Sequence, residues 1–154
     1  MRLLLLMMFS LFAMNASSQD TESATPWQQG DVFVGINSNL DGENLLTMSL
    51  EPTVGLALSD LDIISASVAF SDVNDNTEES YSIGYQRLLT GNLYAGASFA
   101  YSNSTSSESR TDYGVSLGYF GNLNDTWYVS PSIELALGDD ATSVNTNITF
   151  GLRL

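Results

Sequence analysis

The chain has 154 residues, a formal net charge of -14 from 4 Arg and Lys against 18 Asp and Glu, and neither His nor Cys. This length suits one domain, and the scarcity of basic residues excludes a phosphate-binding surface for nucleic acid. Because His and Cys supply the commonest general base and the commonest transition-metal ligands, the sequence predicts no catalytic residues, no metal site and no cofactor, and thus a protein that is not an enzyme.

The N-terminal stretch has the pattern of a secretory signal peptide. Arg2 precedes an apolar run from Leu3 to Ala13, which is too short to span a bilayer that needs ~20 residues. Small residues at Ala16 and Ser18 predict cleavage after Ser18. The expected organisation is a signal peptide over residues 1–18, a short periplasmic N-terminal segment over 19–30 and a barrel over 31–154.

From Val32 onward, apolar and polar residues alternate in runs that are separated by turn-forming residues, which is the period of a β-strand. The pattern predicts about eight strands, most of them of the ~9 to 11 residues that a tilted membrane strand needs. The runs cover residues 32–36, 46–58, 64–70, 81–86, 93–101, 113–119, 127–137 and 143–154. The connections are expected at residues 41–44, 59–62, 71–79, 90–92, 102–109, 121–125 and 138–142.

The last run alternates to the final residue, with Phe150, Leu152 and Leu154 on its apolar face. It resembles the C-terminal strand of bacterial outer-membrane β-barrels, whose end is recognised by the machinery that inserts them. This resemblance implies that Phe150, Leu152 and Leu154 serve as an insertion signal.

The composition of the two strand faces indicates which face is inside the barrel. One face carries large apolar residues, whereas the other carries Ser, Gly, Ala, Thr and Asn with almost no charge. A soluble barrel would show water a face rich in Lys and Glu, so the small polar face is expected inside and the apolar face in hydrocarbon. The fold class predicted is all-β, an eight-stranded antiparallel up-and-down transmembrane β-barrel. Aromatic residues are expected at its two rims, Tyr85, Tyr119, Trp127 and Tyr128 at one and Phe70, Tyr81, Tyr101 and Tyr113 at the other.

Strand parity places two carboxylates, Glu51 and Glu134, inside this barrel, and Arg153 is the clear inward cation at the end of the last strand. A single cation predicts that one carboxylate lacks a full partner. That carboxylate is expected to be protonated, hydrated or bonded to Ser and Asn neighbours.

From about Asp31 to Leu154 the chain resembles the eight-stranded outer-membrane barrels of the outer membrane protein A transmembrane domain, outer membrane protein X and the opacity-type proteins. The resemblance implies a cell outer membrane location, with outer-membrane lipid, lipopolysaccharide and the barrel-assembly machinery as partners. Leu154 stands where the family usually has Phe or Trp, and the loops are short. Pro52 and Pro131 lie inside strands, where each is expected to cause a bulge or a local distortion.

Three functions are consistent with these features. The first is a non-enzymatic structural or surface-interaction barrel, the second a small pore or transporter, and the third a soluble secreted β-barrel that binds an apolar ligand. Enzymes of the wider barrel class pair Ser or Asp with His, which this chain lacks. A faint likeness to a calcium loop near residues 72–83 fails because Thr77 replaces the turn Gly and Ile83 the closing Glu. If both termini are periplasmic, the turns near residues 60, 91 and 122 are periplasmic too. The oligomeric state is left open.

Overall fold

The computed structural model describes residues 25–40, 50–73, 76–105, 108–138 and 142–154. The predicted signal peptide and the first part of the predicted N-terminal segment lie outside these residues. The strands, in chain order, are β1 (Val32–Leu40), β2 (Leu50–Ala57), β3 (Asp62–Val73), β4 (Asn76–Thr90), β5 (Leu93–Ser104), β6 (Arg110–Tyr119), β7 (Gly121–Asn122), β8 (Trp127–Gly138) and β9 (Thr142–Arg153). No helix in the described part of the chain is long and apolar enough to cross a membrane.

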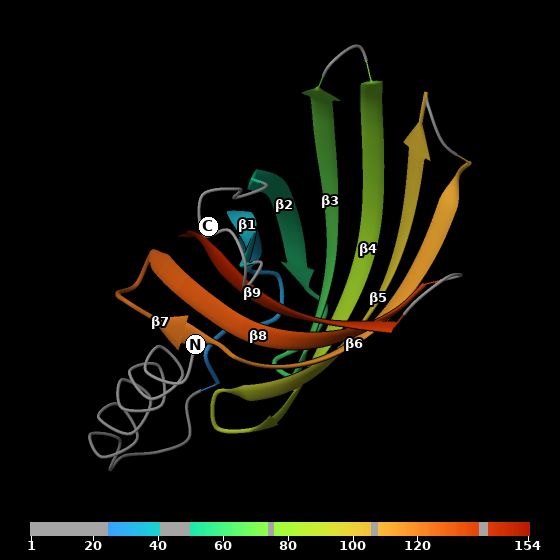
Figure 1. The fold of residues 1–154 in the computed structure, drawn as a ribbon. Coiled ribbons are helices and arrows are strands. Elements are labelled where there is room, and N and C mark those ends of the chain that lie inside the picture. The colour runs from blue at the N-terminus through green and yellow to red at the C-terminus, as the bar shows by residue number, and fades with distance from the viewer. Residues whose placement is uncertain (1–24, 41–49, 74–75, 106–107, 139–141) are drawn as a thin grey trace.

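The strands close into a barrel in which consecutive strands pair antiparallel, except that β6 and β7 both pair with β8 (Figure 1). β1 pairs with β9, and β6 pairs with β8, so the sheet has no free end in its strand order. β7 pairs with β8 in the same register as β6 does, so β7 is a continuation of β6 after a break. The predicted all-β, eight-stranded antiparallel barrel is therefore confirmed.

The apolar face of the strands lies outside the barrel. Large apolar side chains at the middle of the strands are about half exposed, for example Ile83 at 57% and Val115 at 51%. The alternate positions, among them Ser67, Ser82 and Ser98, are buried or half-buried inside. Strand alternation in the sequence therefore predicted correctly which face is outside.

The two hairpins at one end of the barrel are longer than the sequence predicts (Figure 1). Residues 71–79 and 102–109 were expected as loops, but β3 continues to Val73, β4 begins at Asn76 and β5 continues to Ser104. Pairing in continuous register, as in Ser71 with Glu78, satisfies the backbone groups of residues whose intrinsic strand propensity is low. We call this the long-hairpin end. The opposite, tight-turn end carries the turns at residues 58–61, 91–92 and 123–126.

Each proline inside a strand ends or interrupts the ladder on one side only. Pro52 pairs with Ile36 of β1, while the described pairing of β2 with β3 stops at Thr53. Pro131 pairs with Ile148 of β9, and it lies opposite the break between β6 and β7. The missing N–H explains both interruptions. A local distortion was thus predicted correctly. At Pro131 the register is the same on both sides of the break, so the described pairing has no bulge there.

The buried apolar residues gather inside the barrel near the tight-turn end. They are Trp27, Phe33, Ala57, Ile63, Leu88, Tyr94, Phe120 and Tyr128. We call this cluster the aromatic floor. Tyr128 is only 4% exposed, so its expected place in the outer aromatic rim is wrong. The residue alternates with the outward Trp127 and Val129, and strand parity therefore turns it inward.

Candidate functional site: the polar lumen

A cavity of about 290 Å³ occupies the barrel between the aromatic floor and the long-hairpin end. Its wall is built from the small polar residues that alternate with the outer apolar ones, mainly Ser, Thr and Asn from all eight strands of the wall. Hydroxyl groups of neighbouring strands form hydrogen bonds with one another, as between the Oγ atoms of Ser67 and Ser82 at 2.7 Å. The lumen is therefore a polar space enclosed by a wall whose outside is apolar.

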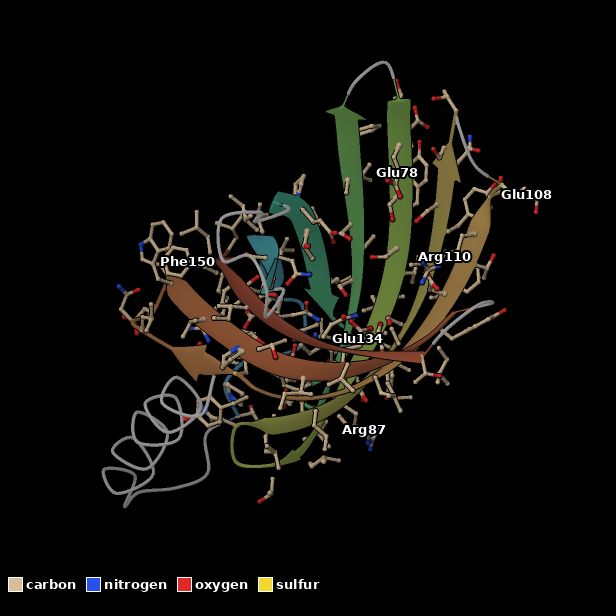
Figure 2. All side chains as sticks on the ribbon, in the orientation of Figure 1. Glu78, Arg87, Glu108, Arg110, Glu134 and Phe150 are labelled. Carbon is tan, nitrogen blue, oxygen red and sulfur yellow. The ribbon has the colours of Figure 1, made fainter. Side chains whose placement is uncertain are left out.

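Glu134 lines this cavity and is held by partners from two other strands (Figure 2). Its Oε1 accepts a hydrogen bond from the Ser98 hydroxyl of β5, and its Oε2 accepts one from Asn147 Nδ2 of β9 at 3.1 Å. Gly114 of β6 leaves room for the carboxylate, because a Cβ atom there would overlap Glu134 Oε1 and Ser98 Oγ. Neutral polar neighbours thus stabilise this carboxylate.

Glu51 of β2 also lines the cavity, and β1 and β9 lie between β2 and the β8 strand of Glu134. It lies opposite Asn37 of β1 in the register and bonds to the Asn37 side chain. Asn37 Oδ1 in turn accepts a hydrogen bond from the Thr149 hydroxyl at 3.2 Å. Glu51 and Glu134 line the same cavity and carry like charges when both are ionised. Both carboxylates therefore depend on Ser and Asn neighbours and have no arginine partner among the described residues.

The arginine of the cavity wall is Arg110, which the sequence analysis did not single out. Its Nε atom lies 2.8 Å from Asp112 Oδ1, and both residues line the cavity. Arg153, the inward cation expected from the sequence, lies at the opposite, tight-turn end. Its guanidinium donates to the backbone oxygens of Pro26 and Asp125 at 2.9 and 3.1 Å, and its Nε atom lies 3.8 Å from Asp31 Oδ2. Arg153 therefore joins the end of β9 to the segment before β1 and to the turn at residues 123–126, and it does not line the cavity.

The aromatic floor closes the lumen toward the tight-turn end. Phe120 stacks on Tyr128 with ring centroids 4.9 Å apart, and Phe33 meets both rings edge to face at 5.4 and 5.5 Å. The Tyr94 hydroxyl bonds to Ser130 Oγ at 2.9 Å, so the floor has one polar contact toward the cavity. Trp27 packs edge to face on Phe120 and Phe33 and completes this layer of rings.

The inward glycines make room for the large rings of the floor. A Cβ at Gly118 would overlap the Tyr94 ring, and a Cβ at Gly35 would lie 2.6 Å from the Tyr128 hydroxyl oxygen. Strict strand parity places Phe33, Tyr94 and Tyr128 inside, so this signal was present in the sequence. Trp27 precedes β1, and strand periodicity says nothing about such a residue.

The three residues expected to form an insertion signal lie on β9 or just after it. Phe150 is on the outer side of the wall (Figure 2), where its ring stacks on Trp127 at a centroid distance of 5.1 Å. Leu152 is half-buried, and Leu154 is 70% exposed. Leu154 exchanges backbone hydrogen bonds with Val32, which joins the two ends of the barrel wall. A role in insertion stays a prediction.

No group of three or more His, Cys, Asp or Glu residues that could hold a metal ion occurs in the described parts of the chain. The side chains at residues 71–76, which include much of the faint calcium-loop pattern, lie outside the described set.

The barrel is similar in fold to several solved structures. The N-terminal β-barrel domain of Pseudomonas aeruginosa OprF has 16% sequence identity and a TM-score of 0.56, with 83% of this chain and 100% of that chain covered. The Yersinia pestis outer membrane protein Ail in a phospholipid bilayer nanodisc has 11% identity and a TM-score of 0.52, with 83% and 100% covered. A de novo designed transmembrane β-barrel has 10% identity and a TM-score of 0.56, with 83% and 98% covered.

Comparison of the sequence with protein-family models and with curated proteins finds no match. The structural likenesses confirm the closed antiparallel β-barrel fold that the sequence predicts. At such low sequence identity these similarities show the fold and not the function of this chain.

Proposed function

We propose that this chain is an integral outer-membrane β-barrel of a Gram-negative bacterium, with a non-enzymatic structural or surface-interaction role in the cell envelope. The observation that carries the proposal is the band of half-exposed large apolar side chains on the outside of a closed, internally polar barrel. Such a surface favours aggregation in water but is stable in hydrocarbon. The fold shared with OprF, Ail and a designed transmembrane barrel supports the same location.

The partners that follow from this location are outer-membrane lipid, lipopolysaccharide and the barrel-assembly machinery. The proposed route is export through the signal peptide over residues 1–18, followed by insertion that depends on Phe150, Leu152 and Leu154. Mass spectrometry of the mature protein tests the first step, with Gln19 as the expected first residue.

The proposal is tested by expressing the chain in a Gram-negative host and separating the membranes. We expect the protein in the outer-membrane fraction, soluble only with detergent, and migrating differently on a gel before and after heating. Recovery from the periplasm without detergent would instead support the soluble secreted barrel that binds an apolar ligand.

The position of the aromatic floor favours a barrel that does not conduct ions while the floor is in place. Eight strands enclose a lumen that side chains fill, and here a layer of rings lies across one end of it. The small pore or transporter remains the alternative, since the cavity of about 290 Å³ is polar and acidic. Frequent single-channel openings of the unmodified protein in planar bilayers would favour this alternative.

A further inference from the structure

Trp27 belongs to the aromatic floor without belonging to the barrel wall. It precedes β1, is fully buried, and meets Phe120 and Phe33 edge to face at centroid distances of 5.1 and 6.5 Å. Its indole Nε1–H has no acceptor among the described residues. A buried donor without an acceptor costs free energy. The buried position of the Trp27 ring is therefore less stable than its ring contacts alone would make it.

A few polar contacts hold the segment around Trp27 at the tight-turn end. The Pro26 carbonyl accepts hydrogen bonds from Asn122 Nδ2 and Arg153 Nη1, both at 2.9 Å. The Gln29 N–H donates to Asp60 Oδ1 at 2.9 Å, and the Gly30 N–H donates to the Ala57 carbonyl at 2.9 Å. These contacts join the segment to β2, β7, β9 and the turn at residues 58–61. The contacts of Pro26 and Gln29 lie outside the pairing of β1 with β2, whereas the contact of Gly30 continues it.

Phe120 is the second ring of the floor, and it lies outside the described pairing with β8. It lies in the break between β6 and β7, opposite Ser130 in the register with β8. The Phe120 N–H donates to the Asn92 carbonyl at 2.8 Å, and Asn92 Nδ2 donates to the Phe120 carbonyl at 2.7 Å. Phe120 is therefore attached to a turn.

The lumen continues past the polar cavity down to this layer of rings. A second cavity of about 40 Å³ lies against Phe33, Phe120 and Tyr128. The two cavities share four wall residues, Thr53, Ser65, Gln86 and Thr149. The aromatic floor is thus what separates the polar lumen from the tight-turn end.

We propose that residues 25–29 act as a removable stopper, in which Trp27 packs on Phe120. Release of this stopper opens a cation-selective path through the barrel. The path passes Glu51 and Glu134, whose charges no arginine of the described residues neutralises, while Arg110 is paired with Asp112. Carboxylates that line a narrow path select cations. The proposal rests on the membrane location proposed above.

The test compares single-channel recordings of the full protein, refolded into planar lipid bilayers, with those of Trp27→Ala and of Trp27→Ala combined with Phe120→Ala. We expect few openings for the unmodified protein, more for the single variant and most for the double variant. In a salt gradient the reversal potential should shift toward that of the cation. Adding Glu134→Gln to the double variant should reduce this shift.

The matched control is Trp127→Ala, which removes the second Trp of the chain from the outer surface, where it is 41% exposed. This variant should conduct like the unmodified protein. Heat-dependent gel migration identifies the variants that fold. If Trp27→Ala does not fold, Asn122→Ala, which loses one contact of the stopper at an exposed position, should still increase the openings.

Folded, inserted variants that stay closed would overturn the stopper, as would an unmodified protein that conducts as often as Trp27→Ala. Failure of the unmodified protein to insert would instead refute the membrane location. The two failures are therefore distinguishable.

Discussion

Glu134 fits inside the barrel because Gly114 beside its carboxylate has no side chain. Gly114→Ala places a methyl group on Glu134 Oε1 and Ser98 Oγ, which breaks the hydrogen bond between them. We expect the free energy of unfolding to fall by about 1–3 kcal/mol, as measured by urea unfolding in lipid vesicles.

Gly55→Ala is the control for this variant. Gly55 also faces inward, but a Cβ there meets its nearest neighbour at 3.5 Å, an ordinary contact. Both changes reduce the entropy of the unfolded chain equally, so the difference between them isolates the overlap. Equal stability of the two variants would show that Glu134 moves away at no cost.

The repulsion between Glu51 and Glu134 predicts a particular result for a double-mutant cycle. Either Glu→Gln change relieves the repulsion between the ionised carboxylates. Glu51→Gln should therefore raise the free energy of unfolding, and Glu134→Gln should raise it less, because its amide nitrogen cannot accept the bond that Asn147 Nδ2 or Ser98 donates. Once one charge is gone, the second change has less to relieve. The sum of the two single gains should therefore exceed the gain of the double variant, by about 0.5–1 kcal/mol. Additive gains would mean that the two charges do not interact.

At the scale of the element, the hairpins of the long-hairpin end carry exposed acidic residues, among them Glu78 and Glu108 (Figure 2). The chain has no Cys, so single cysteines can report on the orientation of the barrel. If the long-hairpin end is extracellular, Glu108→Cys should react with an impermeant maleimide on intact cells.

Asp125→Cys is the matched variant for the opposite end, since Asp125 is an exposed carboxylate in a tight turn. It should react only after the outer membrane is permeabilised. The reverse labelling pattern would invert the orientation, and labelling of both positions on intact cells would argue against insertion.

The sequence predicts the wall of the barrel well because the side chains of a strand alternate, and burial follows this alternation directly. Val34 outside and Gly35 inside are fixed by parity alone. The strand extensions at residues 71–73, 76–79 and 102–104 were missed because residues of low strand propensity, such as Asp72 and Asn103, are paired by their partner strands. Pairing is a property of two segments, and propensity describes one.

The candidate site was predicted in part for the same reason. Parity places Glu51 and Glu134 in the lumen, yet it cannot say that Ser98 and Asn147 bond to one of them or that Arg110 lines the cavity. The docking of Trp27 depends on a tertiary fit with Phe33 and Phe120, which no period in the sequence encodes.

At the scale of the whole molecule, the contrast between an apolar outside and a polar inside favours a barrel that is surrounded by hydrocarbon at mid-height. Ile83 lies near the middle of β4, between the outward Tyr81 and Tyr85, and is 57% exposed. In a bilayer, Ile83→Arg should lower the free energy of unfolding by about 2–4 kcal/mol, since an arginine at the midplane loses its hydration.

Leu123→Arg provides the matched change at a rim. Leu123 is 58% exposed, nearly as much as Ile83, but it lies in the turn at residues 123–126, where the headgroup region would meet the barrel. Its cost should be only about 0–1 kcal/mol, because charges near the interface keep their water. Chemical unfolding in vesicles of both variants measures the difference. In water the two substitutions would cost about the same, so equal effects would contradict a membrane-spanning barrel and favour the soluble alternative.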